Sequence, residues 1–415
     1  MELEPFCLKL CIGSFLKLFE RVSDLLITSV SSEVEMRKIV LLILLTSMSL
    51  ALAAEKKSEK LPTLMHQFYG ALLEMKPFMT SYEDFTKPEN KSKIQFLLKN
   101  FEAKIEGSEV RDLKAPGFDV TYDLLAKHLR LTSYLYEKEI YDTAWNNFRS
   151  TTQFCIACHD RLPKEIGKLK WPSNPNLPSL NVPSQLREAE FLSISHQFDQ
   201  AQEIYDRVIR SYKGSGKPQE KSEDLELAYR RKIAFLARIQ RNPKAAIASL
   251  QEDLKNKSLP LDLRSNIEIW ISYFKLWSQE GKSDLSLLSD QNLIATTTDI
   301  IEKNTEGRRI SISDPAVVQL LRMSGLLYER AFRKKASPLR SELLYALGKC
   351  ERDLAPLHPY SLADIYFRDC ILNEPKNPVA RKCFSEYELA LRQKYRSGAT
   401  EMIEAGLEEL RQKMH

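Results

Sequence analysis

Glycine is scarce in this sequence, because the 415 residues contain only 13. Strand-and-turn architectures need many turn residues, so this scarcity, together with abundant Leu, Ala, Glu, Lys and Arg, favours an all-α fold. Long runs of Lys and Arg are also missing, and a net charge of +5 is small for this length. Neither property favours nucleic acid as a partner. The hydrophobic fraction of 43% nevertheless excludes a wholly disordered chain.

Apolar stretches as long as the ~20 residues of a membrane-spanning helix are missing as well. The longest one follows the basic start Met36-Arg37-Lys38 and ends in Ala51-Leu52-Ala53, an A-x-A cleavage signal. These parts are typical of a secretory signal peptide over residues 36–53, with an uncleaved membrane anchor as the alternative. We therefore expect a periplasmic protein with no transmembrane span in its mature form. Residues 1–35 contain several acidic side chains, which is unusual ahead of a secretion signal. We therefore expect that translation begins at Met36 and that residues 1–35 are a start-site artefact. The alternative is a cytoplasmic extension ahead of a signal anchor.

Cysteines are few, seven in all, and they fall into groups. Cys7 and Cys11 precede the cleavage signal and are expected to be lost with it. Cys155 and Cys158, followed by His159, form C-x-x-C-H, the attachment motif for c-type heme. Two thiols at this spacing can form thioethers with the two vinyl groups on one porphyrin edge, and the histidine then binds the iron as proximal ligand. The motif occurs once, so we expect one covalent heme c.

Amphipathic segments with apolar residues every three or four positions surround this motif. The spacing predicts helices over Leu61–Tyr82, Lys91–Ile105, Val120–Tyr136 and Tyr141–Phe154. Pro88, Gly107 and Pro116-Gly117 separate them. Four antiparallel helices in about a hundred residues predict an up-down four-helix bundle over residues 58–168, with the heme motif at its C-terminal end.

This arrangement resembles the class II cytochromes c, the cytochrome c-prime family. The resemblance rests on motif position, helix count and Cys158-His159-Asp160-Arg161, where a basic residue follows the heme histidine. It implies a distal iron ligand from the first helix. Met65 in that helix would make the heme a six-coordinate electron carrier; His66 is a second candidate, and an open iron site is a third. His128 is expected to cap or pack against the bundle.

A proline-rich segment follows, with four prolines in the twelve residues from Pro172 to Pro183. It predicts an extended linker over residues 169–184. Residues 185–415 read as helical again, with weak repeats that resemble tetratricopeptide helix pairs. The residues that carry these repeats are Ala189 with Phe198, Ala201 and Tyr205; Ala228-Tyr229 with Ala245-Ala246 and Leu250; Leu263–Gln279, with Ile269, Trp270, Tyr273 and Trp277 on one side; Leu343–Gly348 with Tyr360–Tyr366; and a last helix from Pro378 to Lys394. We therefore expect a tetratricopeptide-like α-solenoid whose concave surface holds a partner protein.

Three cysteines lie in this second half. Cys370 and Cys383 flank the turn Asn373-Glu374-Pro375 at similar distances, so antiparallel helices would bring them face to face. In an oxidising compartment this predicts a disulfide between them. A bond between Cys350 and Cys370 is the competing pairing.

Together these features predict an exported monoheme c-type cytochrome that transfers electrons in the periplasm. The helical repeats would dock it to a redox partner protein or an envelope complex, with a second copy of the chain as a further candidate partner. No Ser/His/Asp or phosphate-loop signature and no distal acid–base pair is readable, so an electron carrier is expected rather than an enzyme. Two alternatives keep the heme: a protein that binds or senses NO or CO at an open iron, and an envelope assembly scaffold with a structural heme.

Overall fold

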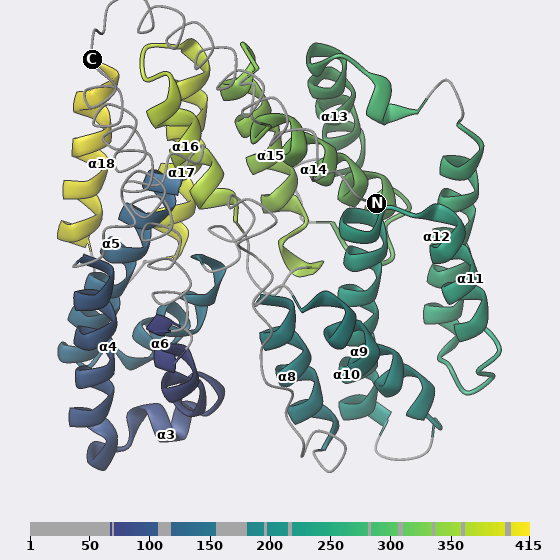
Figure 1. The fold of residues 1–415 in the computed structure, drawn as a ribbon, viewed down its shortest axis with the longest axis horizontal. Coiled ribbons are helices and arrows are strands. Elements are labelled where there is room, and N and C mark those ends of the chain that lie inside the picture. The colour runs from purple at the N-terminus through teal and green to yellow at the C-terminus, as the bar shows by residue number, and fades with distance from the viewer. Residues whose placement is uncertain are drawn as a thin grey trace, which may run out of the picture. The chain divides into compact units, whose positions relative to one another are not determined.

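A computed structural model describes residues 67–68, 70–106, 118–154, 181–194, 197–214, 218–280, 284–305, 310–333, 337–357, 362–394 and 400–415. Over these ranges the secondary structure is helical, without a β-strand, which confirms the predicted all-α class (Figure 1). Residues Phe68–His415 form one compact unit. Within the described ranges no helix combines the length and the apolar composition that a membrane span requires.

The N-terminal helices begin with a helical segment over residues 70–80. It is followed by α3 (Tyr82–Thr86), the 3-10 turn η1 (Pro88–Asn90), α4 (Lys91–Glu106), α5 (Phe118–Glu137) and α6 (Tyr141–Ser150). The continuous helix predicted up to Tyr82 is wrong at its end, because Ser81 interrupts it. The Ser81 hydroxyl accepts a hydrogen bond from the Asp84 amide and so caps the start of α3.

Aromatic side chains fill the core of these helices. The Phe85 ring lies 4.9 Å from the ring of Tyr136 and 5.2 Å from that of Phe148, centroid to centroid, and all three side chains are buried. The Tyr136 hydroxyl also donates a hydrogen bond to the Phe85 carbonyl oxygen, at 3.2 Å. On the neighbouring turn, Trp145 Nε1 donates to the carbonyl oxygen of Phe78, at 2.9 Å. These contacts tie α3, α5 and α6 to the helix before α3.

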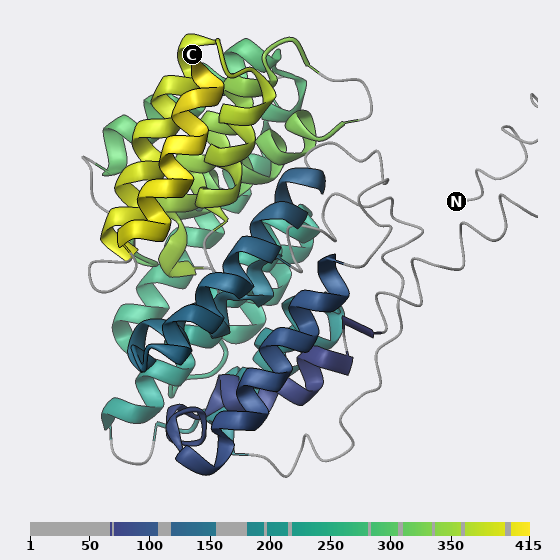
Figure 2. The ribbon, with the colours of Figure 1, turned by 90° about the vertical axis from the view of Figure 1, so that its left-hand side faces the viewer.

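The second half continues as a series of helices. In chain order they are α8 (Val182–Ile194), α9 (Phe198–Ser211), α10 (Pro218–Ala234) with a π-helical end (Phe235–Gln240), α11 (Pro243–Asp253), α12 (Leu261–Gln279), α13 (Asp290–Thr305), α14 (Val317–Ala331), α15 (Arg340–Asp353), α16 (Ala363–Asn373), α17 (Pro378–Lys394) and α18 (Thr400–Met414). Most helices pack against the next one along the chain. In addition, α16 contacts both α5 and α18, so the C-terminal helices lie next to α5 (Figure 2).

Two boundaries of the second half differ from the prediction. The linker expected over residues 169–184 ends earlier, because α8 already begins at Val182. The Asn181 side chain accepts a hydrogen bond from the Ser184 amide, and Pro183 is tolerated in a first helical turn. In α12 only Trp270 of the four predicted stripe residues is buried; the buried face also contains Leu263, Ile267, Ile271 and Phe274.

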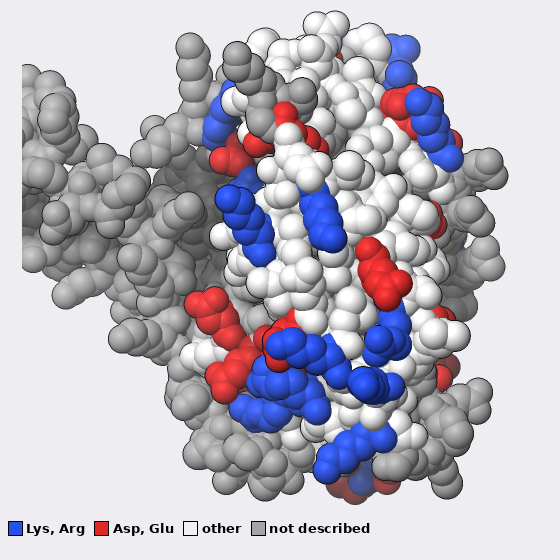
Figure 3. All heavy atoms as spheres, turned by 90° about the vertical axis from the view of Figure 1, so that its right-hand side faces the viewer, with Lys and Arg blue, Asp and Glu red and all other residues white. Residues whose placement is uncertain are grey.

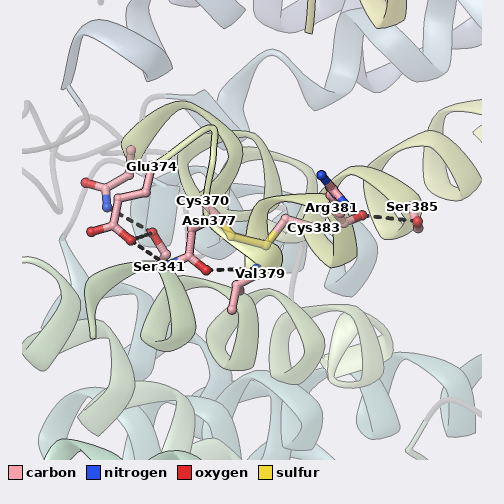
Figure 4. Close-up of a disulfide and its surroundings, with 9 residues drawn as sticks. Ser341, Cys370, Glu374, Asn377, Val379, Arg381, Cys383 and Ser385 are labelled. Atoms are coloured by element: carbon pink, nitrogen blue, oxygen red, sulfur yellow. Dashed lines mark hydrogen bonds between the residues drawn. A yellow bond between two sulfur atoms is a disulfide. The ribbon is translucent and has the colours of Figure 1, made fainter. Parts of the chain in front are cut away.

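The predicted disulfide between Cys370 and Cys383 is present and joins α16 to α17 (Figure 4). The turn between the two helices carries its own hydrogen bonds. Asn377 donates to the Glu374 carboxylate at 2.8 Å and caps α17 by accepting from the Val379 amide at 2.9 Å. Cys350 is a free cysteine and is buried, so the competing pairing does not form.

Candidate cofactor site

The residues predicted to hold the heme are Cys155, Cys158 and His159, with Met65 and His66 as candidate distal ligands. All five lie outside the described residues. Within the described ranges, no group of three or more His, Cys, Asp or Glu side chains could hold a metal ion. Phe154, which is bonded directly to Cys155, is among the described residues, and its surroundings are defined.

A buried polar network fixes the end of α6 against α5. His128 Nε2 donates to the backbone carbonyl oxygen of Asn147, at 2.8 Å. The Asn147 side-chain amide donates to Thr132 Oγ1 at 2.6 Å, and Thr132 Oγ1 donates to the His128 carbonyl oxygen at 2.7 Å. The His128 ring also lies 4.8 Å from the Phe154 ring, centroid to centroid. His128 therefore packs and bonds inside the core, as expected, and orients the segment that leads to the motif.

A cavity of about 470 Å³ opens beside Phe154. Its volume lies in the range of roughly 300–1,000 Å³ that is common for cofactor and ligand sites. One side of its wall consists of Gln153, Phe154 and residues of α5. Residues of α16, α17 and α18 form the other side. The apolar side chains of the wall are Leu124, Leu131, Ile365, Leu391, Met402 and Ile403. The cavity thus has a largely apolar wall, and it adjoins the residue before Cys155.

Charged side chains stand in the same wall: Lys127, Arg130 and Arg368 with Asp364 and Glu409. Lys127 Nζ lies 2.6 Å from a Glu409 carboxylate oxygen, which joins α5 to α18. The hydrogen bond from Lys127 holds the pKa of Glu409 down at about 2, against an ordinary value of 4.5. The Glu409 carboxylate is therefore ionised at neutral pH and is already paired.

Heme is an apolar ring with two carboxylates, and two features of this cavity are compatible with such a group. The wall is largely apolar, with cations among its polar members. In addition, Arg368 is only 3% exposed, yet its Nε has no hydrogen-bond partner in the described part of the chain. A buried donor without a partner is costly, and a ligand carboxylate would supply the missing acceptor.

The heme attachment motif predicted from the sequence lies outside the described residues, and the far wall of this cavity was not predicted. Arg368, Gly406 and Glu409 belong to α16 and α18, more than two hundred residues beyond α5, and no local pattern marks them. Their role depends on packing between distant helices, which periodicity within one helix does not encode. Comparisons with known proteins add no external guide, since no protein-family model, curated protein or solved structure matches this chain.

Proposed function

We propose that this chain is an exported monoheme c-type cytochrome that carries electrons in the periplasm. The observation that supports this most directly is the position of Phe154. This side chain lines a cavity of about 470 Å³, and the next residue opens the only C-x-x-C-H motif in the sequence. Cys155 and Cys158 would hold the heme, and His159 would bind its iron.

Bound heme would supply an iron that alternates between two oxidation states. The chain's own residues would position it and limit its exposure to water. The buried network of His128, Asn147 and Thr132 holds the end of α6 in one orientation. Leu124 and Leu131 of α5 present apolar side chains to the cavity, which favours an apolar ring over water there. A largely apolar, well-anchored surrounding suits electron transfer, because few protein dipoles have to rearrange when the iron changes charge.

The finer architecture belongs to the same proposal: a four-helix bundle over residues 58–168 and a tetratricopeptide-like array over 185–415. The packing of α4 on α5 and of α5 on α6 supports the first. Small buried residues where α8 meets α9, Ala189 and Ala201, support the second.

We assign the docking of a redox partner protein to the helical array. Large apolar side chains are exposed on α12 and just after it: Leu261 is 80% exposed, Leu276 60% and Leu287 70%. The face that includes α11 and α12 carries uncharged surface between its Lys, Arg, Asp and Glu side chains (Figure 3). Such mixed surfaces are typical of transient protein contacts.

The test is an optical spectrum of the purified, exported protein in its reduced and oxidised states, together with heme staining after denaturing electrophoresis. We expect a c-type reduced-minus-oxidised band and a stain that survives denaturation. Both should be lost in the Cys155→Ala, Cys158→Ala variant. Both should remain in the Cys370→Ser, Cys383→Ser variant, which removes the same number of cysteines elsewhere. A wild-type protein without either signal contradicts the proposal, and ready CO uptake by the reduced protein would favour gas binding instead.

A further inference from the structure

The wall of the cavity comes from two distant parts of the chain. Leu124, Lys127, His128 and Leu131 belong to α5, whereas Asp364 through Glu409 belong to α16, α17 and α18. Direct bonds connect the two sides. Lys127 pairs with Glu409, and Arg368 Nη2 lies 3.3 Å from Asp123 Oδ2. The C-terminal helices therefore close the space beside the end of α6.

Arg368 is the residue in this wall whose bonding is incomplete. Its side chain is 4% exposed, its bond to Asp123 is at the long end of hydrogen-bond distances, and its Nε has no partner in the described part of the chain. Asp123 also forms an ion pair with Lys127, whose Nζ lies 3.3 Å from Asp123 Oδ2. A guanidinium binds a carboxylate best through two parallel N–H donors, so an anionic group in the cavity would complete Arg368.

Gly406 marks where the space is open on the α18 side. A Cβ atom added there would meet nothing within 4 Å, although Gly406 lines the cavity. The neighbouring Met402 and Ile403 are apolar. A ligand with an apolar body and at least one carboxylate would suit this wall. Phe154 lines the same space.

We propose that the C-terminal helices complete the heme site: the heme attached at Cys155 and Cys158 occupies this cavity, and Arg368 binds one of its carboxylates. The inference rests on the proposed function and adds to it, because α16 and α18 then hold the cofactor in addition to any docking role. A free carboxylate-bearing apolar molecule would match the same chemistry. The covalent tether one residue beyond Phe154 favours the heme, since its local concentration is far higher.

The first test fills the cavity. Gly406→Trp places a large ring in the space, where an added Cβ meets nothing within 4 Å, and Leu276→Trp is the control: it adds the same ring at a 60% exposed position of α12, outside the cavity wall. Heme staining after denaturation should be equal in both, since attachment is covalent. We expect the Gly406 variant to lose most of its circular dichroism in the heme absorption region and to be reduced several-fold faster by a small hydrophilic reductant. Wild-type values in a folded Gly406→Trp protein would overturn the inference.

The second test removes the cation. Arg368→Gln should lower the reduction potential of the heme, because a nearby positive charge favours the reduced iron. Arg322→Gln is the control, since Arg322 is equally buried and ion-paired but lies away from the cavity. An unchanged potential in Arg368→Gln, or an equal change in Arg322→Gln, contradicts carboxylate binding by Arg368.

Absence of any heme stain in the wild-type protein would defeat the proposed function itself. In that case addition of a free fatty acid, followed by a thermal shift that Gly406→Trp abolishes, would assign the cavity to an untethered ligand.

Discussion

Gly348 in α15 lies directly against the ring of Phe367 in α16. A Cβ atom added at Gly348 would come within 2.5 Å of that ring, which is buried and cannot swing into solvent. Overpacking a core usually costs about 1–3 kcal/mol, and alanine in place of glycine returns roughly 1 kcal/mol in a helix interior. Because the approach to the buried ring is so close, we expect Gly348→Ala to be destabilising by up to about 2 kcal/mol net.

The measurement is the free energy of unfolding from denaturant titration of both glycine variants. Gly70→Ala is the control, because its added Cβ meets nothing within 4 Å. It should be neutral or stabilising by up to about 1 kcal/mol. Equal stability of the two alanine variants would show that α15 and α16 can separate at no cost.

At the scale of residues, the sequence predicted what depends on local spacing and missed what depends on distant partners. Cys370 and Cys383 lie at matching distances from one turn, so their pairing was predictable and is present. Arg368 and Gly406 carry no local signature. In the sequence alone, Arg368 is indistinguishable from a surface arginine, and Gly406 only weakens a helix. Their place in the cavity wall becomes clear from the packing of α16 and α18 near α5. Met65, His66, Cys155, Cys158 and His159 remain predictions.

At the scale of elements, α18 is held to α5 by an ion pair that depends on pH. Lys127 lowers the pKa of Glu409 to about 2 in the folded protein, from an ordinary 4.5. A depressed folded-state pKa contributes stability above the unfolded value and loses it as the pH falls. We expect the contribution of this ion pair to be complete above about pH 5 and to fade between about pH 4.5 and pH 2.

Hydrogen exchange of α18 across this pH range, corrected for intrinsic rates, measures the effect. Protection of α18 should fall below pH 4.5 faster than that of α12, which lacks this pair. In Glu409→Gln the difference between pH 5 and pH 3 should shrink, since the amide does not ionise. Equal pH dependence of exchange in the wild-type protein and in Glu409→Gln would show that solvent screens the ion pair fully. The test is informative because the Glu409 side chain is 40% exposed, and solvent screening weakens exposed ion pairs.

Helix existence was easier to predict than helix ends. The predicted segment Lys91–Ile105 differs from α4 by one residue, and Pro378–Lys394 matches α17. The π-helical end of α10 was not predicted. It faces α14, where a Cβ on Gly325 would lie 3.0 Å from the Arg238 carbonyl oxygen. An irregular turn of this kind follows from the partner helix, so the residues of α10 alone do not reveal it.

At the scale of the whole molecule, Phe68–His415 is one compact unit. Within it, ion pairs join the N-terminal helices to the helices of the second half: Lys76 with Glu188, Lys127 with Glu409 and Arg368 with Asp123. We therefore expect the two parts to unfold together. Phe85→Ala, in the N-terminal core, should cost about 3–5 kcal/mol and should accelerate global hydrogen exchange in α12 as well.

Phe96→Ala provides the control, because the Phe96 side chain is 63% exposed and its loss should change stability little. The comparison uses the slowest-exchanging amides of α5 and α12 in the same sample. If Phe85→Ala accelerates exchange in α5 and leaves α12 at its wild-type rate, the two parts are independent folding units.

The buried thiol of Cys350 has a practical consequence. Burial raises its pKa well above the ordinary 9.0, and the neighbouring Glu351 and Asp353 raise it further. Cys370 and Cys383 are oxidised, and in the heme-loaded protein that we propose Cys155 and Cys158 are thioethers. Of the cysteines from Cys155 onward, only Cys350 would then keep a free thiol, buried in the last turn of α15. Its rate of labelling by a thiol reagent would report how often that helix opens under native conditions. Cys350 is therefore a built-in probe of local unfolding in α15.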